Sequence, residues 1–197
     1  MKKKMVQILL LTVLGIGMVC GCSSNSSMSV DGETRMVTDG ADREVEIPKQ
    51  VEHIVCSGVG ALRYTCYMQA QDLVGGVEDY ERGKEISRGY SIVNGEKFAE
   101  LPVIGGNGDP YAEEIITVDP DIIVMSVRSG LDPDQLQETT GIPVVVIPGS
   151  DGMMDEDAYE TFEILGEVYG KEERAQELIA YMDRVKEDLN MRIAGVP

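Results

Sequence analysis

The 197-residue chain contains no tryptophan, two phenylalanines and a single histidine, His53. One histidine near the start of a predicted strand leaves the serines without an imidazole base of the kind that nucleophilic catalysis needs. The four cysteines show no Cys-x-x-Cys spacing, which argues against a built-in zinc site. Nucleophile-elbow, Walker and metalloprotease motifs are also missing. We therefore expect a protein that is not an enzyme and holds neither cofactor nor metal of its own.

Positive charge is scarce as well. The chain has 17 lysines and arginines against 35 aspartates and glutamates, for a net charge of -18. Such a surface repels phosphate backbones and offers no attraction to anionic lipid headgroups. We expect no nucleic-acid partner. The length is enough for one domain with a real core and an appendage.

The N-terminus has the features of an export signal. Three lysines precede an apolar run over residues 5–19, and small residues and cysteines follow. The run is short for a membrane span, although an uncleaved anchor helix remains the alternative. The residues "VCGC" resemble the bacterial lipobox, which implies lipidation of Cys22, with Cys20 as the other candidate. We expect a lipoprotein signal peptide over residues 1–22 and a flexible tether over 23–34.

Two further cysteines lie in the body of the chain. Cys56 falls in a predicted strand and Cys66 in the helix after it, on segments that face each other. Two buried free thiols are the main expectation, and a disulfide in an oxidising compartment is the alternative.

From Arg35 onward, short apolar strands alternate with helices, which predicts a parallel sheet covered on both faces. A hairpin around "DGAD" comes first. Five strands are expected at residues 53–57, 72–78, 101–105, 121–126 and 143–149. Helices are expected at residues 58–70, at 109–118 with Asp109 as N-cap and Pro110 in first position, and at 131–141 with a Gly141 stop.

Two amphipathic helices are predicted at the end of the chain. The first carries its apolar stripe from Ala158 to Tyr169 and stops at Gly170. In the second, over residues 171–193, apolar residues recur at spacings of three and four. At 1.5 Å per residue this helix is roughly 34 Å long, more than a small domain needs. We expect it to lie along more than one body.

One glycine motif suggests a dinucleotide site. Gly58 and Gly60 follow a strand and open a helix, and acidic residues end the next strand. Arg63 stands where the motif requires its third glycine, and this bulky cation opposes close packing of helix and strand. An exported dinucleotide-dependent enzyme is therefore the weaker alternative.

The ordered motifs resemble a known family. "VTDGADREVEIPKQVEHIVC", "GALR", "LVGGVEDY", "LPVIGG", "AEEIITVDPDIIVMS", "TGIPVVVI" and "FEILGEVYGKEERAQELI" are similar to segments of substrate-binding proteins of ABC importers for iron-siderophores, haem and cobalamin. The set covers about residues 35–193. Asp42 and His53 depart from the usual glycine and arginine.

The resemblance implies an α/β fold: a parallel-sheet N-terminal lobe (35–170) of a two-lobed binding protein, followed by a long interdomain helix (171–197), with the C-terminal lobe absent. It implies a lipid-anchored, extracytoplasmic protein that binds a metal chelate and docks on ABC permease subunits. Ferric siderophore, haem and cobalamin all stay open. A stand-alone surface or sensor protein that does not transport is the alternative.

The resemblance also assigns roles to residues. Glu113 and Glu114 match docking carboxylates for the permease, although first-turn glutamates also suit a helix dipole. Arg63 and Arg128 would attract an anionic chelate, with a surface ion pair as the alternative for each. The full set of implied ligand-binding residues is Ser57, Gly58, Gly60, Arg63, Tyr80, Gly106, Asn107, Ser126 and Arg128.

Overall fold

The computed structural model describes residues 33–83, 88–106, 109–127, 130–149 and 154–194. The predicted signal peptide, nearly all of the predicted tether and Cys22 lie outside these ranges. Within the described part of the chain, no helix combines the length and the apolar character needed to cross a membrane.

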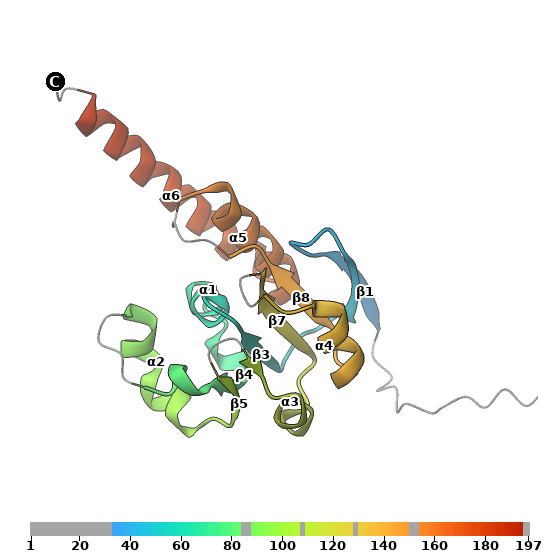
Figure 1. The fold of residues 1–197 in the computed structure, drawn as a ribbon. Helices are drawn as coiled ribbons and strands as arrows, with labels where there is room; N and C mark the ends of the chain where they lie inside the picture. Colours follow the sequence, from blue (N-terminus) through green and yellow to red (C-terminus); the bar gives the residue numbers. More distant parts are fainter. Residues whose placement is uncertain (1–32, 84–87, 107–108, 128–129, 150–153, 195–197) are drawn as a thin grey trace, which may run out of the picture. The chain divides into compact units, whose positions relative to one another are not determined.

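A β-hairpin opens the described chain (Figure 1). Strands β1 (Thr34–Thr38) and β2 (Glu44–Pro48) pair antiparallel, as predicted. Asp42 turns the chain between them with φ of 56°, in the left-handed region that aspartate tolerates better than most residues. The apolar side chains Val37, Val45 and Ile47 point inward and are buried. The hairpin is thus part of the core rather than an arm.

The main sheet has the strand order β6-β5-β4-β3-β7-β8. All neighbours pair parallel except β5 and β6, which are antiparallel. The five predicted strands are confirmed. Their bounds are β3 (Ile54–Ser57), β4 (Val74–Glu78), β5 (Val103–Gly106), β7 (Ile122–Ser126) and β8 (Val144–Ile147).

The sixth strand corrects a prediction. Asp109 and Pro110 do not open a helix; they form the edge strand β6 (Asp109–Pro110), which pairs with β5. Proline lacks an N–H, and a sheet edge is where that loss is tolerated. The helix α3 (Ala112–Val118) begins two residues later, with Tyr111 as its N-cap residue.

The other helices are α1 (Ala61–Tyr67), α2 (Gly89–Glu100), α4 (Pro133–Thr140), α5 (Glu156–Tyr169) and α6 (Glu172–Ile193). Short 3-10 turns lie at Gln71–Leu73 and Asp79–Glu81. Asp132 caps α4 and Gly141 ends it, as predicted. The sequence analysis missed α2. Two glycines, serine and asparagine in this segment lower its helix propensity and hide its periodicity.

Alternate residues of the central strands enter two separate cores, as a sheet covered on both faces requires. In β7, Ile122 and Val124 face a core that includes residues of α1, α5, α6 and the hairpin. Ile123 and Met125 face a second core with residues of α3 and α4. Figure 1 shows these helices on the two sides of the strands.

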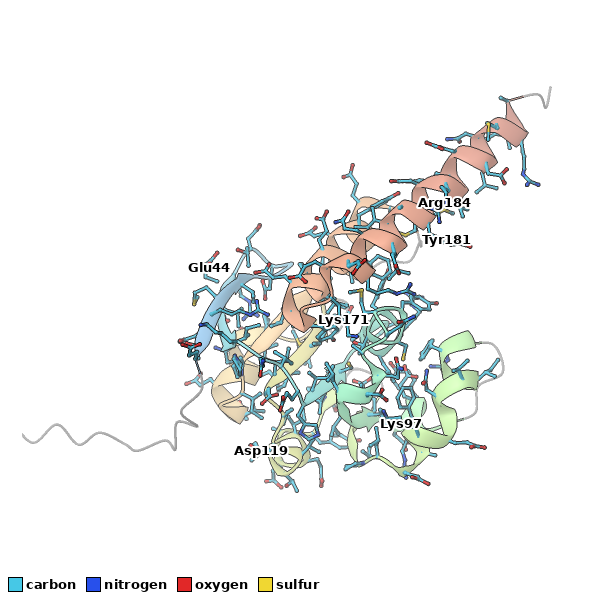
Figure 2. The ribbon with its side chains drawn as sticks, turned by 180° about the vertical axis from the view of Figure 1, so that it is seen from behind. Glu44, Lys97, Asp119, Lys171, Tyr181 and Arg184 are labelled. Atoms are coloured by element: carbon cyan, nitrogen blue, oxygen red, sulfur yellow. The ribbon has the colours of Figure 1, made fainter. Side chains whose placement is uncertain are left out.

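The last two helices form a hairpin of their own. Gly170 adopts φ of 62° and ends α5, as predicted. In α6, Ala175 and Met182 are buried, whereas Leu189 is 45% exposed and Ile193 63% exposed. Tyr181 and Arg184 project from the middle of this helix (Figure 2), with the guanidinium 5.9 Å from the ring centre. Only the first half of α6 is thus covered by the described chain.

Candidate ligand-binding site at the carboxyl edge of the sheet

The strand order creates a crevice between β3 and β7. From β3 the chain adds β4 and β5 on one side, and then crosses to add β7 and β8 on the other. Ligands of open parallel sheets bind outside the carboxyl ends of the strands at such a reversal. Ser57 and Ser126 end these two strands, and both are fully buried. The sheet thus places two predicted site residues at its switch point.

A buried carboxylate orders the loop after β3. Glu78 ends β4 and is 2% exposed. Its Oε1 accepts hydrogen bonds from Ser57 Oγ at 3.2 Å and from the Gly58 N–H at 3.0 Å. Gly58 and Gly60 have φ of 85° and 95°, which only glycine adopts without strain. Both glycines are therefore required by the turn itself, whatever binds beside it.

A cavity of about 250 Å³ opens next to this loop. The loop after β3, helix α1, the 3-10 turn after β4 and the start of α2 form its walls. Arg63 and Tyr80, two predicted site residues, both line it. The complete lining is Val59, Gly60, Arg63, Tyr67, Tyr80, Glu81, Arg88, Gly89 and Tyr90.

Glu81 is the centre of a hydrogen-bond network in this cavity. It is 3% exposed, and both of its carboxylate oxygens accept from Tyr90 Oη, at 2.9 and 3.0 Å. Arg88 Nη1 lies 3.2 Å from Glu81 Oε2 and donates to Tyr90 Oη at 3.2 Å. The Arg88 guanidinium also lies over the Tyr80 ring, 5.4 Å from its centre. Four side chains are thus held in one arrangement.

Burial shifts the acid–base behaviour of these groups. Loss of solvent raises the pKa of Glu81 above its ordinary value, although bonds from Tyr90 and Arg88 oppose the shift. Burial raises the pKa of Tyr90 to about 12. Burial, followed by the nearby carboxylates, raises the pKa of Tyr80 well beyond the ordinary value for tyrosine. Both tyrosines are therefore neutral phenols at physiological pH, able to donate hydrogen bonds.

The remaining predicted site residues lie apart from this cavity. Gly106 ends β5, and a Cβ there would lie 3.0 Å from Tyr111 Oη. Ser126 Oγ lies 2.7 Å from the position of a Cβ on Gly149. Asn107 and Arg128 lie outside the described residues. The structure therefore gathers Gly60, Arg63 and Tyr80 in one cavity, with Ser57 and Gly58 on the loop beside it.

Glu81, Arg88 and Tyr90 were not predicted as site residues from the sequence. None of the three belongs to a quoted motif, and the helix that begins beside Arg88 was not predicted. The available signal was local: Glu81 and Arg88 flank a short glycine-containing segment, seven positions apart. Only the fold shows that Glu81 and Arg88 meet.

The arginine in the glycine motif occupies the space that a dinucleotide motif keeps free. Arg63 Nη2 lies 3.4 Å from the position of a Cβ on Gly60, and its guanidinium lies 5.0 Å from the centre of the Tyr64 ring. The loop conformation is that of a strand-to-helix turn, but the third glycine position carries a cation. This arrangement opposes the close packing that a dinucleotide motif requires, while it places a positive charge beside the loop.

Cys56 and Cys66 are free thiols, as expected. Cys56 Sγ lies 3.3 Å from Thr65 Oγ1, and Cys66 Sγ accepts a weak bond from Asn94 at 3.8 Å. Burial raises the pKa of both thiols to about 12, so neither is a reactive thiolate at neutral pH. Among the described residues, no group of three or more His, Cys, Asp or Glu side chains is arranged to hold a metal ion.

Glu113 and Glu114 lie in the first turn of α3 and are exposed. Their position suits both a docking contact and the helix dipole. Docking stays a prediction.

Comparisons with known proteins agree with this geometry. A family model described as periplasmic binding protein matches residues 72–196. The petrobactin-binding protein YclQ of Bacillus subtilis is 22% identical over 187 residues, which cover 93% of this chain and 56% of that protein. The chain thus spans little more than half the length of this curated relative.

Solved structures share the fold. A periplasmic solute-binding protein from Veillonella parvula aligns with a TM-score of 0.68 at 19% identity, over 84% of this chain and 50% of that one. The molybdate-binding protein MolA of Haemophilus influenzae, with molybdate bound, gives 0.68 at 19% identity, over 83% and 55%. Both solved chains extend well beyond the matched part.

Proposed function

The chain belongs to the periplasmic binding protein family, and on this premise we propose that it is the extracytoplasmic substrate-binding component of an ABC importer for a metal chelate. The observation that carries the proposal is the cavity beside the sheet's switch point, where Arg63 and Arg88 meet two neutral tyrosines. Guanidinium groups are donors suited to anionic oxygen ligands such as carboxylates and catecholates. The petrobactin-binding relative supports a ferric siderophore as the first ligand to test.

The family fold supports binding rather than catalysis. The described residues provide one wall of a cleft, and we propose that a second lobe supplies the opposite wall in the complete receptor. A ligand held on one face only is incompletely desolvated, so this chain alone should bind weakly. Exposed apolar residues on the second half of α6 are consistent with a further body there.

The anchoring and docking predictions are part of the same proposal. Lipidation of Cys22 would hold the receptor at the outer face of the cytoplasmic membrane. Glu113 and Glu114 would then present two exposed carboxylates to the permease. Mass spectrometry of the membrane fraction tests the first point, because diacylglyceryl modification adds a characteristic mass to the peptide that begins at Cys22.

The ligand is tested by calorimetric titration with ferric petrobactin, ferric citrate, molybdate and a nicotinamide dinucleotide. We expect heat of binding with a ferric chelate, and about tenfold weaker binding in Arg88→Ala. Arg82→Ala is the matched control, because this exposed arginine donates to the Ala99 carbonyl and is not among the residues that line the cavity. Binding of the dinucleotide alone would overturn the proposal.

A further inference from the structure

The described residues that bond to Arg88 contact one of its three nitrogens. Both of its hydrogen bonds, to Glu81 and to Tyr90, use Nη1, and its flat face lies over Tyr80. Within the described ranges, no residue accepts a hydrogen bond from its Nε or Nη2. The Nε and Nη2 atoms form a planar fork that matches the two oxygens of a carboxylate. The side chain is 31% exposed and lines the cavity.

Glu81 accounts for this orientation. Its side chain is 4% exposed, and a carboxylate at such a depth is costly unless partners satisfy its oxygens. Tyr90 donates to both oxygens and Arg88 pairs with one, so the three side chains fix one another. Arg88 precedes α2 and Tyr90 lies in its first turn, where Tyr90 is part of the buried core. Through Glu81 and Tyr90, Arg88 is tied to this core.

We propose that Glu81 is a positioning residue for ligand binding: it holds Arg88 so that the Nε–Nη2 edge meets a carboxylate of the chelate without reorientation. This inference rests on the proposed function and narrows it to chelates that carry a free two-oxygen anionic group. The gain is preorganisation, since a guanidinium that is already ordered loses less freedom when the ligand binds. Glu81 itself does not touch the ligand.

The first experiment needs no ligand. Side-chain ¹⁵N relaxation of the arginine Nε atoms, with Arg88 assigned from Arg88→Lys, should show a restricted Arg88 in the wild-type chain. Glu81→Ala should make Arg88 as mobile as the exposed Arg82. Glu81→Met serves where the alanine variant does not fold, because it fills similar volume without an acceptor. Glu81→Gln should restore the restriction, since its amide oxygen still accepts. An Arg88 equally restricted without the Glu81 carboxylate would overturn the proposal.

The second experiment is a double-mutant cycle with ferric citrate as the probe. Glu81→Ala and Arg88→Ala should each weaken binding about tenfold, the size expected for a charge-assisted bond. The double variant should bind no more weakly than Arg88→Ala alone, because Glu81 acts through Arg88. Losses that add would show that Glu81 acts independently, which would overturn the positioning role. A wild-type chain that binds no chelate would instead refute the proposed function, while the relaxation data still decide the role of Glu81.

Discussion

Two buried carboxylate–arginine pairs lie on either side of β3 in the strand order, and their hydrogen bonding differs. Asp39 and Arg43 join the N-terminal hairpin to the edge strand β8, whereas Glu81 and Arg88 line the cavity next to β4. Both carboxylates are almost completely buried, at 2% and 3% exposure. The difference lies in how many donors of each arginine are already used.

Nearly all hydrogen-bond donors and acceptors of the Asp39–Arg43 pair are used. Arg43 uses all three of its guanidinium nitrogens, donating to Asp39, to Asp134 and to the Val144 carbonyl. Asp39 accepts from three backbone N–H groups in addition, those of Ala41, Arg43 and Val146. These bonds use four of the five N–H groups of the Arg43 guanidinium, so this pair is a structural latch that covers the edge of β8.

In the Glu81–Arg88 pair, fewer of the arginine's donors bond to described residues. The same two chemical groups meet, but the described partners of Arg88 take only Nη1. The two pairs have the same residue types and similar burial of the carboxylate. Their hydrogen bonds are what distinguish the structural pair from the candidate binding pair. Substitutions in the two pairs test this difference.

The largest effect is expected at the latch. Asp39→Ala removes one carboxylate that serves five donors and leaves the Arg43 charge and the Val146 N–H poorly satisfied. We expect a loss of about 3–5 kcal/mol in the free energy of unfolding, measured in urea. Asp134→Ala is the control, because its carboxylate is 75% exposed and should cost less than about 1 kcal/mol. Equal losses would contradict the latch.

Substituting lysine for each arginine tests the difference between the two pairs directly. Arg43→Lys cannot reproduce the fork and should cost about 1–3 kcal/mol of stability. Arg88→Lys should change the free energy of unfolding by less than about 1 kcal/mol, because its pair is partly exposed. The effect of Arg88→Lys should instead appear as weaker binding of the chelate. Urea unfolding and calorimetric titration of both variants provide the measurement, and a stability loss at Arg88 as large as that at Arg43 would remove the distinction.

The close contact of hairpin and sheet provides a third test. The Gly40 N–H donates to the Val146 carbonyl at 2.9 Å, and a Cβ at Gly40 would lie 2.3 Å from Pro148 Cδ. Gly40→Ala should therefore destabilise the fold by about 1–3 kcal/mol through overpacking. Gly89→Ala is the matched control on the cavity side, where a new Cβ meets nothing within 4 Å. It should be neutral or slightly stabilising in thermal unfolding.

The smallest effect concerns pH. The pKa of Glu81 is raised in the folded state by burial, so the folded chain binds its proton more tightly than the unfolded chain. The resulting stabilisation is fully present below the unfolded pKa, near 4.5, and is lost as pH rises through the folded pKa. The stability difference between wild type and Glu81→Gln should therefore favour wild type more at pH 4.5 than at pH 7.5. Urea unfolding at both values checks this, and a difference independent of pH would contradict it.

Much of the fold followed from local pattern. The five buried strands and the capped helix α4 were predicted because short apolar runs, Asp-Pro starts and glycine stops act within a few residues. The start of α3 was wrong, because pairing of Pro110 with β5 depends on a partner strand that sequence pattern does not show. Helix α2 was missed, because its stability comes from packing of Phe98 and Tyr90 rather than from propensity.

The candidate site divides in the same way. The sequence by itself determined the strand ends, the glycine turn and Arg63, because these lie within one strand-to-helix unit whose pattern is local. Only the tertiary structure decided that Glu81, Arg88 and Tyr90 meet, and that Arg88 keeps a fork open while Arg43 does not. The use of a guanidinium is set by which neighbours fold against it. Arg43 meets Asp134 and the Val144 carbonyl from segments far along the chain, whereas Arg88 meets Glu81 because the turn after β4 contacts the start of α2.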